Sequence, residues 1–266
     1  MSTAAGGWFA VLLVVALAAA LMFLTLPIVA IFAQQPPGDL IVALGEEGAL
    51  DALWLSLRAT AAALALILVV GTPAAYALAT RRFRGRALLI TLIELPLVLP
   101  PAVAGIALLA AVGPSTPLGR AAENAGLQLS LATAGVVVAL TFVAAPFYLR
   151  QAIAAFGAVD PTLLDASRTL GAAPARTFSR VAVPTALPGL VAGTALALGR
   201  ALGEFGATLM FAGSFQGVTQ TVPLAIYDRF ATDFTAALAL SAVLVAVSAA
   251  ILLAVKLVRG PEVVTR

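Results

Sequence analysis

Six long apolar stretches constrain this chain more than any other feature of its sequence. Each holds about 20 or more residues with few charges, which is the length that a helix needs to cross the hydrocarbon core of a bilayer. Apolar residues cover all sides of each stretch, as they do in helices that contact lipid, so the pattern predicts membrane-spanning helices. The expected spans are residues 8–33, 53–80, 87–112, 130–148, 183–213 and 234–258.

Composition supports a membrane protein and excludes several kinds of chemistry. Hydrophobic residues make up 62% of the chain, and there is neither cysteine nor histidine, which excludes disulfides, thiol nucleophiles and the common zinc sites. The only lysine, Lys256, is followed by Leu257, so the chain lacks the G-K-[ST] loop that binds ATP phosphates. We therefore expect no cofactor, no metal and no ATP site of its own, and nucleic acid is not an expected partner.

Positive charges are divided unequally between the two sides of the predicted bundle. The loop 81–86, the segment 150–180 and the C-terminal tail carry eleven basic residues, whereas the opposite loops carry only Arg120 and Arg229. Cytoplasmic loops of membrane proteins are enriched in arginine and lysine, so this pattern places both termini in the cytoplasm. The expected location is a bacterial or archaeal cell membrane, crossed several times and in contact with lipid.

One cytoplasmic segment is too polar for a span and too apolar for a solvated loop. In "DPTLLDASRTLGAAPARTFSRVAVPTALPG", Asp160 followed by a proline predicts a helix start, and Gly171 predicts its end in a left-handed conformation. A second short helix is expected to begin at Pro174 and to end before Pro184. The residues expected to share one face of the first helix are Leu163, Ala166, Ser167 and Leu170.

Two interpretations of this segment remain open on pattern alone: an amphipathic element lying on lipid, or a platform for a cytoplasmic partner. The segment also closely resembles the cytoplasmic EAA loop of ATP-binding-cassette (ABC) importer permeases. Aspartate replaces glutamate and serine replaces the second alanine of that motif, and both changes keep size and charge type. The resemblance implies a coupling helix seated in an ATPase subunit, with contacts from Asp165, Ala166, Ser167, Arg168, Gly171, Arg176 and Phe178.

Two further stretches narrow the resemblance. "ELPLVLPPAVAGIALL" and "GRALGEFGATLMFAGSFQGVTQTVPLAIY" resemble the molybdate permease subunit, and sulfate and tungstate permeases of the same group are the alternatives. The resemblance implies an all-α integral membrane protein with the six-helix type I ABC importer fold. It also implies a homodimer of permease chains, cytoplasmic ABC ATPase subunits and an external oxyanion-binding protein as partners. The expected organisation is a first span with its external loop (1–50), a transmembrane core (51–258) containing the EAA loop (150–182), and a cytoplasmic tail (259–266).

Prolines and charges within the spans are candidate pathway features. Three prolines and a glycine interrupt the third span, which we expect to be kinked or broken, either to line a pathway or to pack against a neighbour. Arg200 and Glu204 are four residues apart and can pair. Arg58 either snorkels to the interface or attracts an anion, and Glu94 either reaches the interface or meets an arginine of the loop 81–86. The pathway candidates are Pro96, Pro100, Pro101, Gly105, Arg200 and Glu204, with Arg58 at the entrance.

Two rival functions remain at this stage. A secondary anion transporter or channel requires a relay of ionisable groups in the membrane, for which the few intramembrane charges are thin support. A membrane enzyme requires catalytic side chains that this composition scarcely provides. Small-residue pairs, Gly189 with Gly193 and Gly199 with Gly203, permit close helix approach, although a chain rich in glycine and alanine also produces such spacings by chance.

Overall fold

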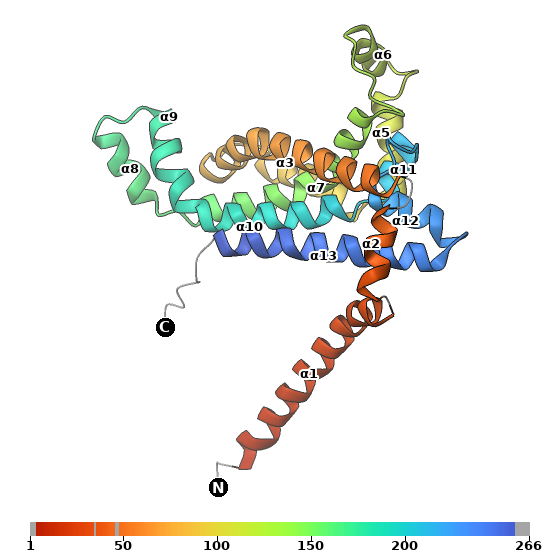
Figure 1. The fold of residues 1–266 in the computed structure, drawn as a ribbon. Coiled ribbons are helices and arrows are strands. Elements are labelled where there is room, and N and C mark those ends of the chain that lie inside the picture. Colours follow the sequence, from red (N-terminus) through yellow and green to blue (C-terminus); the bar gives the residue numbers. More distant parts are fainter. Residues whose placement is uncertain (1–3, 35, 46–47, 259–266) are drawn as a thin grey trace.

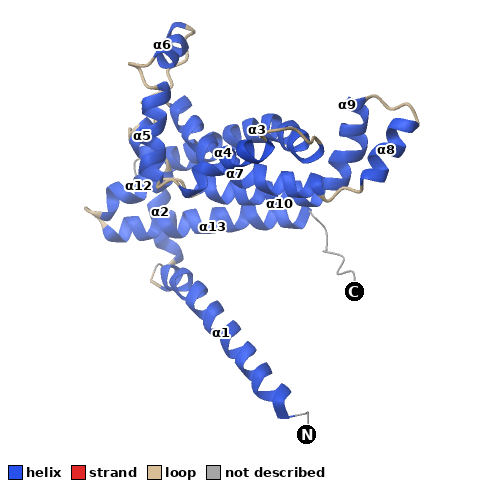
Figure 2. Ribbon diagram, turned by 180° about the vertical axis from the view of Figure 1, so that it is seen from behind, coloured by secondary structure: helices blue, strands red, loops and turns tan. Residues whose placement is uncertain are grey.

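The computed structural model describes residues 4–34, 36–45 and 48–258, and all regular structure in these ranges is helical (Figure 2). This confirms the all-α prediction; the tail 259–266 lies outside the described residues. In chain order the helices are α1 (Ala4–Ala33), α2 (Pro37–Gly45), α3 (Ala49–Thr80), α4 (Arg86–Val98), α5 (Pro101–Val112), α6 (Pro117–Asn124), α7 (Thr133–Gly157), α8 (Pro161–Thr169), α9 (Pro174–Thr177), the π-helical turn η1 (Phe178–Ala182), α10 (Val183–Leu202), α11 (Gly206–Ala212), α12 (Val222–Phe230) and α13 (Phe234–Val258).

The long helices form a bundle with distinct structures at its two ends. α3, α7, α10 and α13 lie side by side, with α8 and α9 beyond one end and α6 and α12 at the other (Figure 1). α1 leaves the bundle at an angle, and its side chains are exposed over nearly its whole length. Five stretches of the described chain are long and apolar enough to cross a membrane, and α4 with α5 makes a sixth if that bent pair is one span.

Two expected span boundaries are wrong. The span expected at 183–213 ends at Leu202, because the chain leaves the helix at Gly203 and restarts as the separate helix α11. The span expected at 130–148 belongs to a helix that continues to Gly157. The charge of Arg150 does not end that helix, since Ala152 and Phe156 beyond it are buried in the bundle core.

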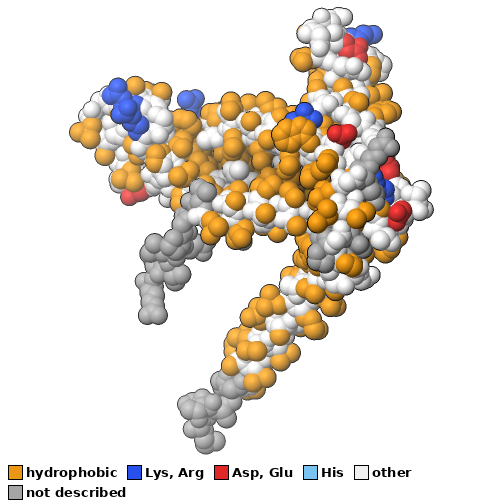
Figure 3. Space-filling view, in the orientation of Figure 1, with side chains coloured by type: hydrophobic (Ala, Val, Ile, Leu, Met, Phe, Trp, Pro, Cys, Tyr) orange, Lys and Arg blue, Asp and Glu red, His pale blue; other side chains and the backbone are white. Residues whose placement is uncertain are grey.

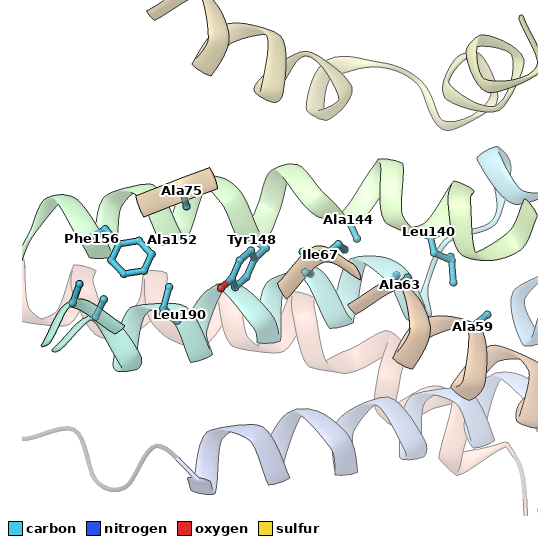
Figure 4. Packing of buried hydrophobic residues seen from close by; sticks show 14 of the residues in the cluster. Ala59, Ala63, Ile67, Ala75, Leu140, Ala144, Tyr148, Ala152, Phe156 and Leu190 are labelled. Atoms are coloured by element: carbon cyan, nitrogen blue, oxygen red, sulfur yellow. The ribbon is translucent and has the colours of Figure 1, made fainter. Parts of the chain in front are cut away.

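The core of the bundle is built from residues spaced four apart, which lie on one face of a helix. Alanine fills most of the α3 row and alternates with large side chains in the α7 row, so the two helices pack closely. Tyr148 is the largest buried side chain, and its hydroxyl lies 2.6 Å from Oγ1 of Thr72, so this buried polar group has a partner. The α3 row comprises Ala59, Ala63, Ile67 and Ala75, and the α7 row comprises Leu140, Ala144, Tyr148, Ala152 and Phe156 (Figure 4).

The two glycine pairs have different surroundings. A Cβ at Gly193 would lie 3.1 Å from Cβ of Gln151, and one at Gly189 would collide with Ala155, so this pair allows α10 to pack closely on α7. Gly199 has no such neighbour within 4 Å. The glycine spacing therefore allows a helix contact at Gly189 and Gly193. At Gly199 no neighbouring helix of the described chain makes such a contact.

The third span is broken, as its prolines predict. The chain bends by 119° between α4 and α5, and Leu99 between them is extended because the following residue is Pro100. The second half, α5, packs against α11 through glycines on both helices. A Cβ on Gly105 would lie 2.7 Å from the backbone oxygen of Ala207, and one on Gly206 would lie 2.8 Å from Cβ of Pro101. The second half of the broken span therefore packs on the short helix that follows α10.

We predict that Gly105→Ala destabilises the protein, whereas Gly199→Ala does not. The new methyl at position 105 would overlap a backbone oxygen that belongs to another helix, and overpacking of this kind costs about 1–3 kcal/mol. The methyl at position 199 enters open space, and alanine favours a helix over glycine by up to about 1 kcal/mol. Thermal unfolding of the two purified variants measures the difference; equal unfolding temperatures would contradict the close α5–α11 contact.

Candidate functional site

The segment between α7 and α10 forms a helix–turn–helix unit at one end of the bundle. α8 lies across the direction of the long helices, and α9 returns the chain to α10 (Figure 1). In the space-filling view, arginine side chains gather at this end of the molecule (Figure 3). The sequence prediction of a structured element here, rather than a bare connecting loop, agrees with this arrangement.

The start of α8 is capped by Asp160, as expected from the sequence. Its Oδ1 accepts a hydrogen bond of 2.8 Å from the backbone N–H of Thr162, and Pro161 occupies the first turn. This N–H, together with the Thr162 side chain, lowers the pKa of the Asp160 carboxyl below its ordinary value. A lowered pKa means that the cap stabilises α8 above the unfolded-state pKa and is lost only as the pH falls through the folded-state pKa. The cap is therefore complete at neutral pH.

The end of α8 is a Schellman motif centred on Gly171. The backbone N–H of Gly171 donates to the oxygen of Arg168, and the N–H of Ala172 donates to the oxygen of Ser167, at 2.9 and 3.1 Å. Gly171 has a φ of +80°, in the left-handed region that residues with a Cβ rarely adopt. The position therefore requires glycine for its backbone conformation.

Side-chain contacts fix α8 against α9. The hydroxyls of Ser167 and Thr177 lie 2.9 Å apart, and Thr177 is buried. Asp165 and Arg168 form an exposed ion pair of 3.0 Å within α8. Exposed pairs of this kind contribute little to stability, so both side chains remain available to another molecule.

Phe178 points toward the bundle rather than outward. Its ring centroid lies 5.0 Å from that of Tyr76 on α3 and 6.3 Å from that of Phe156 on α7. Tyr76 and Phe156 also pack on each other, with centroids 5.4 Å apart. Three aromatic rings from three elements therefore join the helix–turn–helix unit to the bundle, and Phe178 contributes to this unit as a packing residue.

The expectation that the second short helix ends before Pro184 is wrong. α9, η1 and α10 continue without interruption through Pro184. In η1 the backbone N–H of Val183 donates to the oxygen of Phe178, five residues back. The wider π turn changes the hydrogen-bond register just before the proline, and the helix continues although Pro184 has no N–H to donate.

The residues predicted near a pathway divide between two breaks. Pro100 and Pro101 lie at the break between α4 and α5, and Pro96 lies within α4. At the break between α10 and α11, Arg200 forms an ion pair with Glu204, which is 1% exposed. Oε1 of Glu204 also accepts a 2.6 Å hydrogen bond from the backbone N–H of Ala207.

Glu204 therefore caps the start of α11 while it pairs with Arg200. Sequence reasoning found the pair but missed the cap, because it treated residues 183–213 as one span. Glycines on both sides of the glutamate, at positions 203 and 206, were the available signal of a break. Gly105 lies in the α5–α11 contact and is buried.

The two other charges that the sequence analysis singled out within spans, Glu94 and Arg58, have identified neighbours. Glu94 lies 3.7 Å from Nε of Arg150 on α7, so its partner is not an arginine of the loop 81–86. Within that loop region, Nε of Arg86 donates instead to the backbone oxygen of Leu78 at 2.6 Å. The guanidinium of Arg58 lies over the ring of Trp54, 5.1 Å from its centroid, with both side chains exposed.

A family model decides the membership of the chain. Residues 68–259 match the family of binding-protein-dependent transport system inner membrane components, and this match includes α8 and the Gly171 turn. The chain belongs to this family. It is also 44% identical to the "Molybdenum transport system permease protein ModB" of Mycobacterium tuberculosis, over 89% of this chain and 90% of that protein.

Solved structures show the same fold at low sequence identity. A bacterial ABC transporter involved in the import of the polysaccharide alginate has a chain that matches with a TM-score of 0.74 and 18% identity, over 97% of this chain and 96% of that one. The MetNI methionine ABC transporter, in an inward-facing conformation, gives a TM-score of 0.62 at 21% identity, covering 81% and 95%. The fold is that of a type I ABC importer permease, and the chain is a multi-pass membrane protein.

We predict that Gly171→Val loosens the turn after α8, whereas Gly157→Val leaves it intact. A Cβ meets nothing within 4 Å at either position, so the two changes differ mainly in the positive φ of Gly171. A left-handed residue with a side chain costs roughly 1–2 kcal/mol, which corresponds to about five- to thirtyfold more frequent local opening. Trypsin cleavage after the exposed Arg168 and Arg176 measures that opening in purified protein. Unchanged cleavage in Gly171→Val would show that the turn tolerates a side chain.

Proposed function

We propose that the chain is the permease subunit of an ATP-driven, binding-protein-dependent importer of molybdate. The observation that carries the proposal is the 44% identity, over nearly the whole of both chains, to a molybdenum transport permease. The family description adds a binding protein as a component of such systems. Two copies of this chain would enclose the pathway between them, and an external binding protein would deliver the oxyanion.

We further propose that α8 docks on a cytoplasmic ATPase subunit. The supporting features are a capped helix, a glycine-specific turn, the Ser167–Thr177 contact that fixes α8 on α9, and the packing of Phe178 on the bundle. ATP hydrolysis takes place in the partner, and the docking unit passes the resulting movement to the spans. The pathway then opens alternately to the two sides of the membrane. Asp165, Ala166, Ser167, Arg168 and Arg176 would contact the ATPase, while Phe178 would hold the unit on the bundle.

The proposed pathway lies near the two helix breaks. The second half of the broken span, α5, packs on α11, and irregular backbone at membrane depth occurs where protein or a watery cavity surrounds it. One face of α5 is exposed on this chain, including Val103 and Ile106. In a homodimer this face could line the space between the two copies, while Gly105 on the opposite face maintains the contact with α11.

The orientation is part of the proposal and has a direct test. The loop 81–85 lies at the same end of the bundle as α8, and the segment around α6 lies at the opposite end (Figure 1). Because the natural chain has no cysteine, Arg84→Cys and Ala125→Cys each introduce one labelling site. We expect an impermeant thiol reagent to label position 125 in intact cells and position 84 only after the membrane is opened. The reverse pattern would place α8 outside the cell and eliminate the ATPase proposal.

Transport is tested with the tagged chain, the ATPase that copurifies with it and the corresponding binding protein, reconstituted in proteoliposomes. We expect molybdate-loaded binding protein to stimulate ATP hydrolysis and uptake. Arg58→Ala should slow uptake without changing which oxyanion is carried, because a single exposed cation can concentrate anions but cannot measure their size. Uptake that needs no ATPase would indicate a secondary transporter, and a change from molybdate to sulfate in the variant would locate selection in this chain.

A further inference from the structure

A groove of about 460 Å³ separates α8 from α9 and η1. α8 provides one wall with side chains spaced three or four residues apart, which are the residues that the sequence placed on one helix face. The arginines of α9 and η1 stand on the other wall. The side chains that define the groove are Leu163, Ala166, Ser167, Leu170, Arg176 and Arg180.

The shape of the groove is fixed within this chain. The hydrogen bond between Ser167 and Thr177 joins its two walls, and the Schellman motif at Gly171 closes one end. The aromatic contacts of Phe178 then hold the second wall on the bundle. A ligand would therefore meet a prepared surface, which reduces the entropy lost on binding.

The charge of the groove is uncompensated by the residues that line it. Arg176 and Arg180 are exposed, and neither forms an ion pair with any residue in the part of the chain that the structure describes. No acidic side chain lines the groove. The acid on α8, Asp165, already pairs with Arg168. Two guanidinium groups four residues apart thus remain available to a carboxylate.

The apolar part of the groove is unusually accessible. Leu163 is 46% exposed, and Leu170 is 88% exposed, the largest value among the big hydrophobic side chains described. Leu170 lies just before Gly171, at the turn beyond the end of the bundle (Figure 1). Covering the two leucines would remove apolar surface from water, so the groove offers both an apolar and an ionic contact.

We propose that this groove binds an acidic segment of the ATPase subunit, in which a carboxylate contacts Arg176 and Arg180 and an adjacent apolar side chain covers Leu163 and Leu170. The inference rests on the proposed docking of α8, and it adds the chemical character of the partner surface. The paired cations, the absence of acids from the lining and the exposed leucines together select an occupant that is negative at one end and apolar at the other.

A phospholipid fits the groove less well because its polarity runs in the opposite order. From α10 back toward α8, the chain passes Arg180 in η1, then Arg176 in α9, and finally reaches Leu170 at the end of α8. A lipid in the bilayer carries its apolar chains inward and its charge outward. It would therefore place hydrocarbon beside the arginines and leave Leu170 uncovered. A protein segment that approaches from the cytoplasm has no such restriction.

The first test measures binding of the ATPase that copurifies with the tagged wild-type chain. We expect Arg176→Glu/Arg180→Glu, in phosphatidylcholine nanodiscs, to bind this ATPase at least about tenfold more weakly than wild type. The milder Arg176→Gln/Arg180→Gln should lose less, and it also serves if the double reversal does not fold. Arg84→Glu removes an exposed cytoplasmic arginine outside the groove and should bind normally.

The second test identifies the occupant. A photoreactive maleimide on Ala172→Cys, inside the groove, should capture an ATPase peptide that contains aspartate or glutamate beside an apolar residue. Ala158→Cys, exposed outside the groove, should not capture that peptide. Changing the captured acid to lysine should restore binding to the Arg176→Glu/Arg180→Glu variant.

The outcomes separate this inference from the function on which it rests. If wild type retains no ATPase, the proposed docking itself fails. If wild type binds and both arginine variants bind equally well, only the groove inference fails. If Arg176→Glu/Arg180→Glu loses binding only in nanodiscs that contain phosphatidylglycerol, the arginines recognise anionic lipid, and the acidic ATPase segment is rejected.

Discussion

The absence of water from the hydrocarbon core of a membrane governs this structure, because every backbone N–H and C=O placed there must find a partner within the protein. Long helices satisfy this requirement along most of each span. At the two interruptions part of this requirement is met locally: α11 begins with the Glu204 carboxylate on the Ala207 N–H, and α5 begins with Pro101, which has no N–H to satisfy. Glycines then bring the two half-helices into contact. Breaks that would be costly against lipid are stable because they lie against each other.

The end of the bundle that carries α8 obeys a different requirement. There the backbone is accessible to water, so short elements with caps and turns can replace long helices. Asp160 begins α8, Gly171 ends it, and the aromatic contact of Phe178 with Tyr76 attaches the unit to the bundle. Thr177 and Phe178, which fix the unit, are turned inward, whereas the exposed Leu170, Arg176 and Arg180 line a groove. The exposed side chains of the unit can therefore contact another molecule while its buried side chains keep it attached to the bundle.

Much of the fold could be predicted from the sequence because membrane helices and their caps depend on local composition. The length of the apolar stretches predicted the long helices, and three prolines predicted the break between α4 and α5. The cap at Asp160 and the glycine at position 171 predicted where α8 begins and ends. The failures have different causes. The break after α10 was missed because residues 183–213 were taken as one apolar span despite the glycines beside Glu204, and the helix continues through Pro184 by way of a π turn. The partner of Glu94 was missed because Arg150 is distant in sequence, and likewise no local pattern shows that two helices enclose a groove.

The unbroken helix from α9 through α10 has a mechanical consequence. At 1.5 Å per residue, the 20 residues of α10 form a rod of about 30 Å, so a tilt of about 5° at one end displaces the other by about 3 Å. The first end of this rod carries the groove wall with Arg176 and Arg180, and the second carries Arg200, which pairs with Glu204 at the cap of α11. Since α11 is packed on α5, a tilt of a few degrees at the groove end of the rod would move the start of α11. The shift would be comparable to the width of one oxygen atom.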